Sequence, residues 1–261
     1  MIVGNKLSGA YDSKLWKFLV RVFGSLDLHT QLRIKPLKKF IVSHQSDFHK
    51  KKIVEIGCSS GINCFEILFN SDPDLVLGFD LNPKSIDSAI RKADALKVSD
   101  KVKFHCTDAT EFDFSKIGKV DCILLMDFLE HINNPEKFLN SLRTILNDET
   151  TVIVSVPTYN YKKVFGEKFH LQLGHVRDGF SVREIRELFK AIGYEITEYS
   201  YNTGLFGALG CFLYYRILSN NNSLAKQLLL YPFHFIDFIN NERLSASLFV
   251  VLKVPRTDQV H

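Results

Sequence analysis

Hydrophobic positions along this chain fall into short apolar runs and into longer stretches with a helical period. From residue 52 onward the two kinds alternate. Short apolar runs bounded by Gly, Pro or Asp predict buried strands, and apolar positions three and four apart predict amphipathic helices. The expected strands are residues 52–57, 75–80, 102–107, 120–127, 151–157, 194–202 and 244–254. The expected helices are residues 61–70, 83–97, 135–146 and 181–191.

This alternation of strands with helices predicts an α/β fold. Helical crossovers between parallel strands are right-handed and cover both faces of the sheet, so we expect a doubly wound, Rossmann-like sheet. In such sheets ligands bind at the carboxyl ends of the strands. Residues that bind a ligand are therefore expected where each expected strand ends.

Two regions stand outside the alternation. At the N-terminus we expect one helix over residues 12–23 and another over residues 30–43, with a break near Pro36. Residues 203–243 predict two very apolar helices that are split at residues 220–222, inserted between the last two strands. Three interpretations of this insert remain open, namely a lid, a dimer face or a membrane-contacting surface. The expected domains are an N-terminal helical cap (1–50), a core (51–203 and 244–255) and the apolar insert (204–243).

Composition and charge narrow the class of protein. The chain has 261 residues, of which 46% are hydrophobic and 24% charged, as is usual for a globular domain. Its five cysteines form no C-x-x-C pair, which argues against disulfides and a zinc knuckle and favours a reducing compartment. We recognise no signal peptide, so we expect a cytoplasmic protein, peripheral at the inner membrane surface if it contacts a membrane.

The positive charge is concentrated near the N-terminus. Residues 1–52 hold 11 Lys or Arg against three Asp, a net charge of +8, whereas the whole chain has +4. Such a segment suits an anionic substrate or a membrane surface, although a solvated helix face is the simpler explanation.

The stretch VEIGCSSGINCFEI (54–67) carries the clearest chemical signal. Glu55 precedes a loop of the form Gly57-x-Ser59-x-Gly61. A dinucleotide loop brings backbone amides close to a pyrophosphate, which a neighbouring carboxylate would repel. The same carboxylate favours a ligand with an ammonium group. S-adenosylmethionine has an amino-acid head, a sulfonium and no phosphate, and is such a ligand.

Two more acids follow at the next strand ends. Asp80 ends the second expected strand, where a carboxylate accepts hydrogen bonds from ribose hydroxyls. Asp108 follows the third strand and is placed to accept from the adenine amino group, with the Ala109 amide on a ring nitrogen. Three acids at successive strand ends are a more specific signal than any one of them.

With these residues the chain resembles the class I S-adenosylmethionine-dependent methyltransferases, and within them the branch that acts on small molecules, glycans and lipids. The resemblance rests on EIGCSSG (55–61), Asp80, the turn at 107–109, the block DCILLMDFLEHINNPEKFLNSLRTIL (121–146) and GFSVREIRELFKAIGYE (179–195). It implies a seven-stranded sheet whose seventh strand is antiparallel and inserted beside the sixth. It also implies that S-adenosylmethionine is the cofactor and S-adenosylhomocysteine the product. The implied cofactor-binding residues are Glu55, Gly57, Cys58, Ser59, Gly61, Asp80, Leu81, Asp108, Ala109 and Met126.

One residue of the loop departs from the family pattern. Ser59 stands where glycine is commoner, and we expect it to cost little if its φ is negative.

Methyl transfer to an oxygen or nitrogen often needs a base for the acceptor's proton. We expect His131, in the EHI turn after the fourth strand, to serve as that base, with local packing as the alternative role. His175 is expected to contact the substrate, with His170 and Arg177 in the same loop. Tyr11 and Arg33 are further candidates for the methyl end of the cofactor.

The predicted function is methyl transfer to a small-molecule, glycan or lipid-linked acceptor, without a metal. An alternative reading groups Asp127, Glu130, His131 and His175 as a divalent metal site, which looks like that of small-RNA 2′-O-methyltransferases. Against RNA, the insert is apolar rather than basic. A non-catalytic S-adenosylmethionine-binding protein is a second alternative. An NAD-dependent oxidoreductase is disfavoured by Glu55 and by the missing third glycine.

Overall fold

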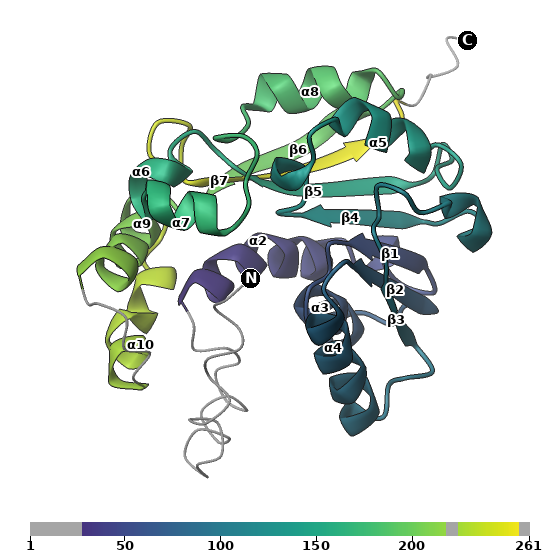
Figure 1. The fold of residues 1–261 in the computed structure, drawn as a ribbon, viewed down its shortest axis with the longest axis horizontal. Helices are drawn as coiled ribbons and strands as arrows, with labels where there is room; N and C mark the ends of the chain where they lie inside the picture. The colour runs from purple at the N-terminus through teal and green to yellow at the C-terminus, as the bar shows by residue number, and fades with distance from the viewer. Residues whose placement is uncertain (1–27, 218–223, 256–261) are drawn as a thin grey trace. The chain divides into compact units, whose positions relative to one another are not determined.

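The computed structural model describes residues 28–217 and 224–255 (Figure 1). Its strands form one seven-stranded sheet with the order β3-β2-β1-β4-β5-β7-β6. The pairs β1–β2, β2–β3, β1–β4 and β4–β5 are parallel, and β7 is antiparallel. The strands are β1 Lys52–Ile56, β2 Leu75–Asp80, β3 Val102–Cys106, β4 Cys122–Met126, β5 Thr151–Pro157, β6 Glu195–Asn202 and β7 Ser247–Lys253. The Rossmann-like sheet expected from the sequence is therefore confirmed.

Helices cover the sheet on two sides, with α3 and α4 on one face and α5 and α8 on the other (Figure 1). The helices are α2 Leu28–Ser43, α3 Ile62–Asn70, α4 Pro83–Leu96, α5 Pro135–Leu142, α6 Tyr161–Phe165, α7 Glu167–Gln172, α8 Val182–Lys190, α9 Leu205–Phe212 and α10 Leu224–Leu230. Short 3-10 turns are η1 Gln45–Asp47, η2 Phe114–Ile117, η3 Leu129–His131 and η5 Tyr231–His234, and η4 Leu213–Ile217 is a π-helical turn.

The helix starts follow from local capping chemistry. Asn82 and Asn134 accept backbone N–H bonds at the first turns of α4 and α5, each of which begins with a proline. Ser181 and Glu184 form a reciprocal capping box at the start of α8. Gly193, which follows this helix, has φ +87°, a left-handed conformation that favours glycine.

Three expectations about the helices need correction. The helix at residues 28–43 has no break at Pro36, because buried side chains on both sides of the proline hold it in place. The helix from residue 135 ends at Leu142 rather than 146, since the amides of Arg143 and Ile145 bond to carbonyls only three residues back. Helices α6 and α7 lie where we expected only a loop. The expected helix at 12–23 falls outside the described residues.

The chain divides into two compact units, which we describe separately. Unit 1 consists of Met1–Pro36, Pro157–Gly179 and Ser200–Ser247, and unit 2 of Leu37–Val156, Phe180–Tyr199 and Leu248–His261. The core of unit 2 surrounds β1, β2 and β4, whose central residues are fully buried. Unit 1 has its own apolar core, to which Leu32, Phe165, Cys211 and Leu230 contribute. Within the described ranges, no helix combines the length and the apolar character that crossing a bilayer requires.

Candidate functional site

The loop after β1 is built on left-handed backbone. Gly57 has φ +78° and Gly61 has φ +76°, a region that favours glycine. The amides of Gly57 and Cys58 both donate to the Phe79 carbonyl of β2, at 2.8 and 2.9 Å. A Cβ atom on Gly61 would lie 2.6 Å from the Phe104 ring. Both glycines are therefore required, and the loop lies at the carboxyl ends of β1 and β2.

Ser59 has φ +49°, so the condition under which we expected serine to cost little, a negative φ, is not met. The reason lies in Asp80, whose Oδ2 accepts a hydrogen bond from the Ser59 amide at 2.8 Å. Oδ1 of the same carboxylate accepts from the Asn82 amide, also at 2.8 Å. A charged acceptor with two backbone donors is strong enough to hold one serine in a left-handed conformation.

Glu55 lies on β1 and is buried, with 1% of its surface exposed. Its two carboxylate oxygens accept from Asn63 Nδ2 at 2.7 Å and from Cys64 Sγ at 2.9 Å, both on the first turn of α3. Burial raises the pKa of Glu55 to about 7, and the hydrogen bonds from Cys64 and Asn63 only partly oppose this rise. Its two donors are neutral, so the charge of an ionised Glu55 is not balanced by them.

The neighbouring strand ends carry the remaining predicted cofactor residues. Asp108 is exposed after β3 and accepts at Oδ1 from the amide and hydroxyl of Thr110, while Ala109 is buried. Leu81, just after Asp80, is largely exposed, and Met126 is buried at the end of β4. The parallel register of β1, β2, β3 and β4 brings these ends to one edge of the sheet.

The chemistry of this edge suits S-adenosylmethionine. Glu55 and Asp80 supply acceptors for an ammonium group and for hydroxyls, and each oxygen of Asp80 keeps a second lone pair beyond its amide bond. Leu81 offers an exposed apolar side chain beside them for a flat base. A pyrophosphate would instead meet two carboxylates.

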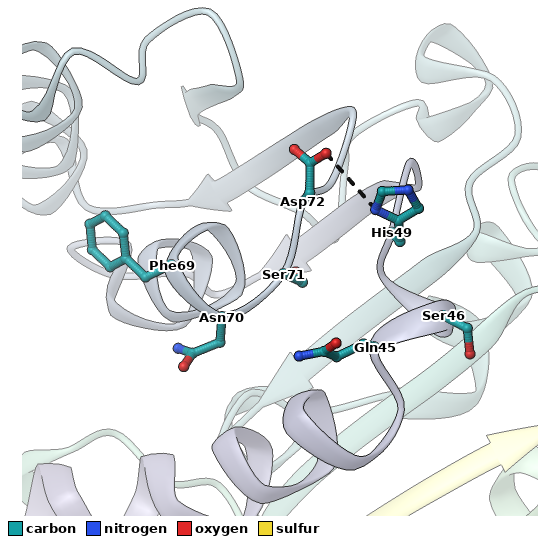
Figure 2. Close-up of a pocket in the computed structure, with 7 residues that line it drawn as sticks. All are labelled: Gln45, Ser46, His49, Phe69, Asn70, Ser71 and Asp72. Carbon is teal, nitrogen blue, oxygen red and sulfur yellow. Dashed lines mark ion pairs between the residues drawn. The ribbon is translucent and has the colours of Figure 1, made fainter.

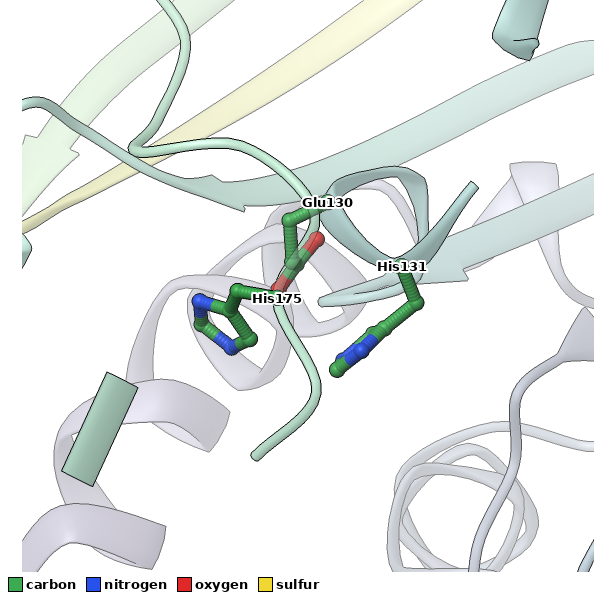
Figure 3. Close-up of side chains that lie close together, drawn as sticks. All are labelled: Glu130, His131 and His175. Atoms are coloured by element: carbon green, nitrogen blue, oxygen red, sulfur yellow. The ribbon is translucent and has the colours of Figure 1, made fainter. Parts of the chain in front are cut away.

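The turn η3 follows β4 and carries Glu130, which is buried, and His131 (Figure 3). Asp127 precedes it with φ +50°, and its Oδ1 accepts from the Ser155 hydroxyl of β5 at 3.2 Å. Asp127 is thus oriented toward β5. Glu130 and His131 belong to unit 2 and His175 to unit 1, and the assignment of His131 as a base remains a prediction.

Within unit 1, His175 belongs to a chain of polar contacts. Its Nδ1 lies 3.2 Å from Nδ1 of the buried His170, whose Nε2 lies 3.4 Å from Oδ1 of Asp178. These contacts link His175 through His170 to a carboxylate, which can only accept hydrogen bonds.

Three further residues were predicted to lie near the methyl group or the acceptor, namely Arg33, Arg177 and Tyr11. Arg33 is exposed on α2, and Arg177 lies in the loop after α7. Tyr11 falls outside the described residues.

A cavity of about 510 Å³ lies elsewhere in unit 2 (Figure 2). His49 precedes β1 and Asp72 precedes β2, so the cavity is at the amino ends of these strands, away from the predicted cofactor residues. His49 Nδ1 and Asp72 Oδ2 face one another at 3.9 Å. Its lining residues are Gln45, Ser46, His49, Phe69, Asn70, Ser71 and Asp72.

Several residues that shape the site were missed by sequence reasoning. Asn63 and Cys64 hold Glu55, and Lys92 donates to the Ser60 carbonyl at 3.3 Å. A signal for the first two was available, because the first turn of a helix after such a loop faces back toward the strand end. Lys92 had no such signal, since it reaches the loop from the far end of α4.

Comparisons with known proteins agree with this geometry. A family model described as a methyltransferase domain matches residues 28–199. The ubiquinone biosynthesis O-methyltransferase of Aromatoleum aromaticum is 25% identical over 144 residues, which cover 54% of this chain and 60% of that protein. The protein of the same name from Cupriavidus pinatubonensis is 30% identical over 149 residues, which cover 54% of this chain and 56% of that protein. The chain thus matches less than two thirds of the length of these relatives.

Among solved structures, geranyl diphosphate C-methyltransferase from Streptomyces coelicolor, in complex with Mg²⁺, geranyl diphosphate and S-adenosylhomocysteine, has a similar fold. The TM-score is 0.61 at 12% identity, over 85% of this chain and 78% of that one. At this identity the likeness concerns the fold alone.

Proposed function

Because the chain belongs to the methyltransferase-domain family of class I S-adenosylmethionine-dependent methyltransferases, we propose that it methylates a small-molecule, glycan or lipid-linked acceptor. S-adenosylmethionine is the cofactor of this family, and S-adenosylhomocysteine is the second product. The cofactor supplies a methyl group activated by its sulfonium.

The observation that carries the proposal is the pair of buried acids around the left-handed loop. Glu55 is held by neutral donors and Asp80 by backbone amides. An ammonium group near Glu55 would offset the cost of its buried charge, and hydroxyls near Asp80 would use its remaining lone pairs. The loop would then orient the amino-acid end of the cofactor, and Leu81 with Ala109 would contact its base.

If the acceptor is a hydroxyl or an amine, a base must take its proton during methyl transfer. We assign this role to His131, next to the end of β4, and acceptor contact to His175. The contacts from Asp178 through His170 support the position of His175.

Within the acceptor classes, we favour an amphipathic molecule methylated on oxygen. The curated relatives described above are O-methyltransferases of ubiquinone biosynthesis, although each match covers only part of their length. Unit 1 also presents a strongly apolar surface, which suits an acceptor with an apolar tail.

The cofactor is tested first by thermal stability of the full chain with S-adenosylmethionine, S-adenosylhomocysteine or NAD. A ligand at 100 times its dissociation constant stabilises the native state by about 2.7 kcal/mol, which raises Tm by a few degrees. We expect this shift with both adenosyl compounds, none with NAD, and its loss in Asp80→Ala. Asp87→Ala removes an exposed acid from α4 and serves as the matched control.

The transfer step is tested with labelled methyl groups and a panel of hydroxylated, prenylated and glycosylated acceptors. We expect His131→Ala to lower kcat while the thermal shift with S-adenosylmethionine stays. Unchanged turnover in His131→Ala would remove the base assignment. Binding of the cofactor without transfer to any acceptor would favour a non-catalytic binding protein.

A further inference from the structure

The segment Phe235–Ile239 of unit 1, which follows η5, has an inverted pattern of burial. Its four large apolar side chains point outward: Phe235 is 65% exposed, Ile236 41%, Phe238 72% and Ile239 36%. Asp237, in the middle, is buried at 6% exposure. A surface segment normally buries its apolar side chains and exposes its acid. We call residues 235–239 the apolar loop.

The inversion is fixed by contacts with α9. The Asp237 carboxylate accepts from the Gly204 amide at 3.2 Å and from the Gly207 amide at 3.0 Å, where α9 begins. The Leu205 amide also donates to the Ile239 carbonyl at 3.0 Å. A Cβ on Gly204 would collide with that carbonyl oxygen, and one on Gly207 would lie 2.8 Å from Asp237. The apolar loop therefore lies directly on the glycines of α9, and its acid can only point inward.

The exposed apolar surface extends beyond this loop. Leu205 at the start of α9 is 42% exposed, and it is linked to the loop through its own amide. The turn η5 contacts both α9 and α10, and α10 exposes Leu228 and Leu229. Exposed apolar side chains gathered in this way mark an interaction surface.

Charge identifies the partner. The described residues of unit 1 hold nine Lys or Arg against four Asp or Glu, a net charge of +5. Lys35 lies beside the start of the apolar loop, since its Nζ donates to the His234 carbonyl at 2.7 Å. The exposed Arg243 follows the loop by four residues, next to the exposed Glu242. Two copies of this unit would bring like charges together, whereas an anionic bilayer attracts the cations and accepts the apolar side chains.

We propose that the apolar loop, flanked by Lys35 and Arg243, docks unit 1 onto the surface of an anionic lipid bilayer. The aromatic side chains of Phe235 and Phe238 enter the interface between headgroups and acyl chains, and the cations contact the headgroups. This peripheral docking does not depend on the transfer reaction.

The test is flotation of the full chain with phosphatidylcholine vesicles, with and without phosphatidylglycerol. We expect binding to the anionic vesicles that weakens with added salt, because screening reduces the attraction. The double variant Phe235→Ser/Phe238→Ser should lose at least about tenfold in vesicle affinity. Phe69→Ser removes a phenylalanine that is 60% exposed in unit 2, and should bind like the wild type.

Two outcomes would overturn the proposal. One is a wild type that ignores anionic vesicles, and the other is a double variant that binds them equally well. If sedimentation showed a dimer that the double variant dissociates, with no vesicle binding, the loop would be a contact between copies. The thermal shift with S-adenosylmethionine, measured on every variant, confirms folding and separates a failure of docking from a failure of the proposed cofactor site.

Discussion

Replacing Glu55 by Gln measures how much the buried charge of Glu55 lowers the stability of the folded chain. Burial raises the pKa of Glu55 from 4.5 to about 7. If the unfolded chain keeps the ordinary value, this pKa difference changes the free energy of unfolding by roughly 3 kcal/mol once Glu55 is ionised in both states. Gln keeps the shape and can still accept from Asn63, while its amide can face Cys64. The substitution therefore removes the charge with little change in packing.

The sign of the effect follows from proton binding. Between pH 4.5 and about 7 the native chain holds a proton on Glu55 that the unfolded chain has lost, so stability falls as pH rises through this window. Below the window both states are protonated, and above it both are ionised. We expect Glu55→Gln to match the wild type near pH 4.5 and to exceed it by up to roughly 3 kcal/mol at pH 8.

Urea unfolding of both proteins from pH 4.5 to 8 measures this difference. Subtracting the unfolding free energy of the wild type from that of the variant at each pH removes the contributions of all other titrating groups, which the two proteins share. Two parallel profiles would refute the reasoning, because Glu55 would then have an ordinary pKa or be ionised with a counter-charge. Calorimetry gives a second readout. Wild-type affinity for S-adenosylmethionine should rise with pH up to about 7, since the ammonium needs an ionised Glu55, and Glu55→Gln should bind weakly at every pH.

Four other predictions concern the loop and the acceptor side. Asp80→Asn should weaken S-adenosylmethionine binding by at least about tenfold in calorimetry, since hydrogen bonds to a charged group are worth about 1.5–3 kcal/mol. Ser59→Gly should change unfolding stability by less than about 1 kcal/mol, because relief of the left-handed conformation offsets the entropy of glycine. Gly61→Ala should cost more than about 2 kcal/mol in the same assay, since its Cβ would meet a phenylalanine ring at 2.6 Å. His175→Ala should raise KM for the acceptor by about tenfold with a smaller change in kcat, because its proposed role is acceptor contact, and His170→Asn should have a weaker effect of the same kind.

Much of the fold could be predicted because the central strands are buried on both faces. Such strands are continuous apolar runs, as at 122–126 and 151–157, and the helices between them have clear caps. Helices α6 and α7 were missed because they have only five and six residues, too few for a helical period to be visible. The helix through Pro36 persists because burial outweighs the local cost of proline.

The site was predictable in its residue types but not in its local conformations. Acids at strand ends are visible in the sequence, and register then brings Glu55 and Asp80 to one edge. The positive φ of Ser59 depends on a hydrogen bond that its amide donates to a residue 21 positions away, which no local pattern contains. The outward direction of Phe238 likewise depends on Asp237 meeting the glycines of α9, thirty or more positions earlier.

The two buried acids also explain why the loop departs from a dinucleotide site in more than one residue. Each carboxylate oxygen of Asp80 accepts one hydrogen bond from a backbone amide, and the bond from Ser59 stabilises the turn at that residue. Each oxygen therefore has one lone pair left to accept a hydrogen bond from a ligand. Glu55 has neutral donors on both oxygens, and a second acid, Asp80, further raises its pKa. A phosphate would add a third negative charge to this edge, whereas a cation would favour the ionised form of Glu55. The sequence feature that first distinguished the loop, an acid two residues before its first glycine, is thus the group whose charge a cationic ligand would stabilise.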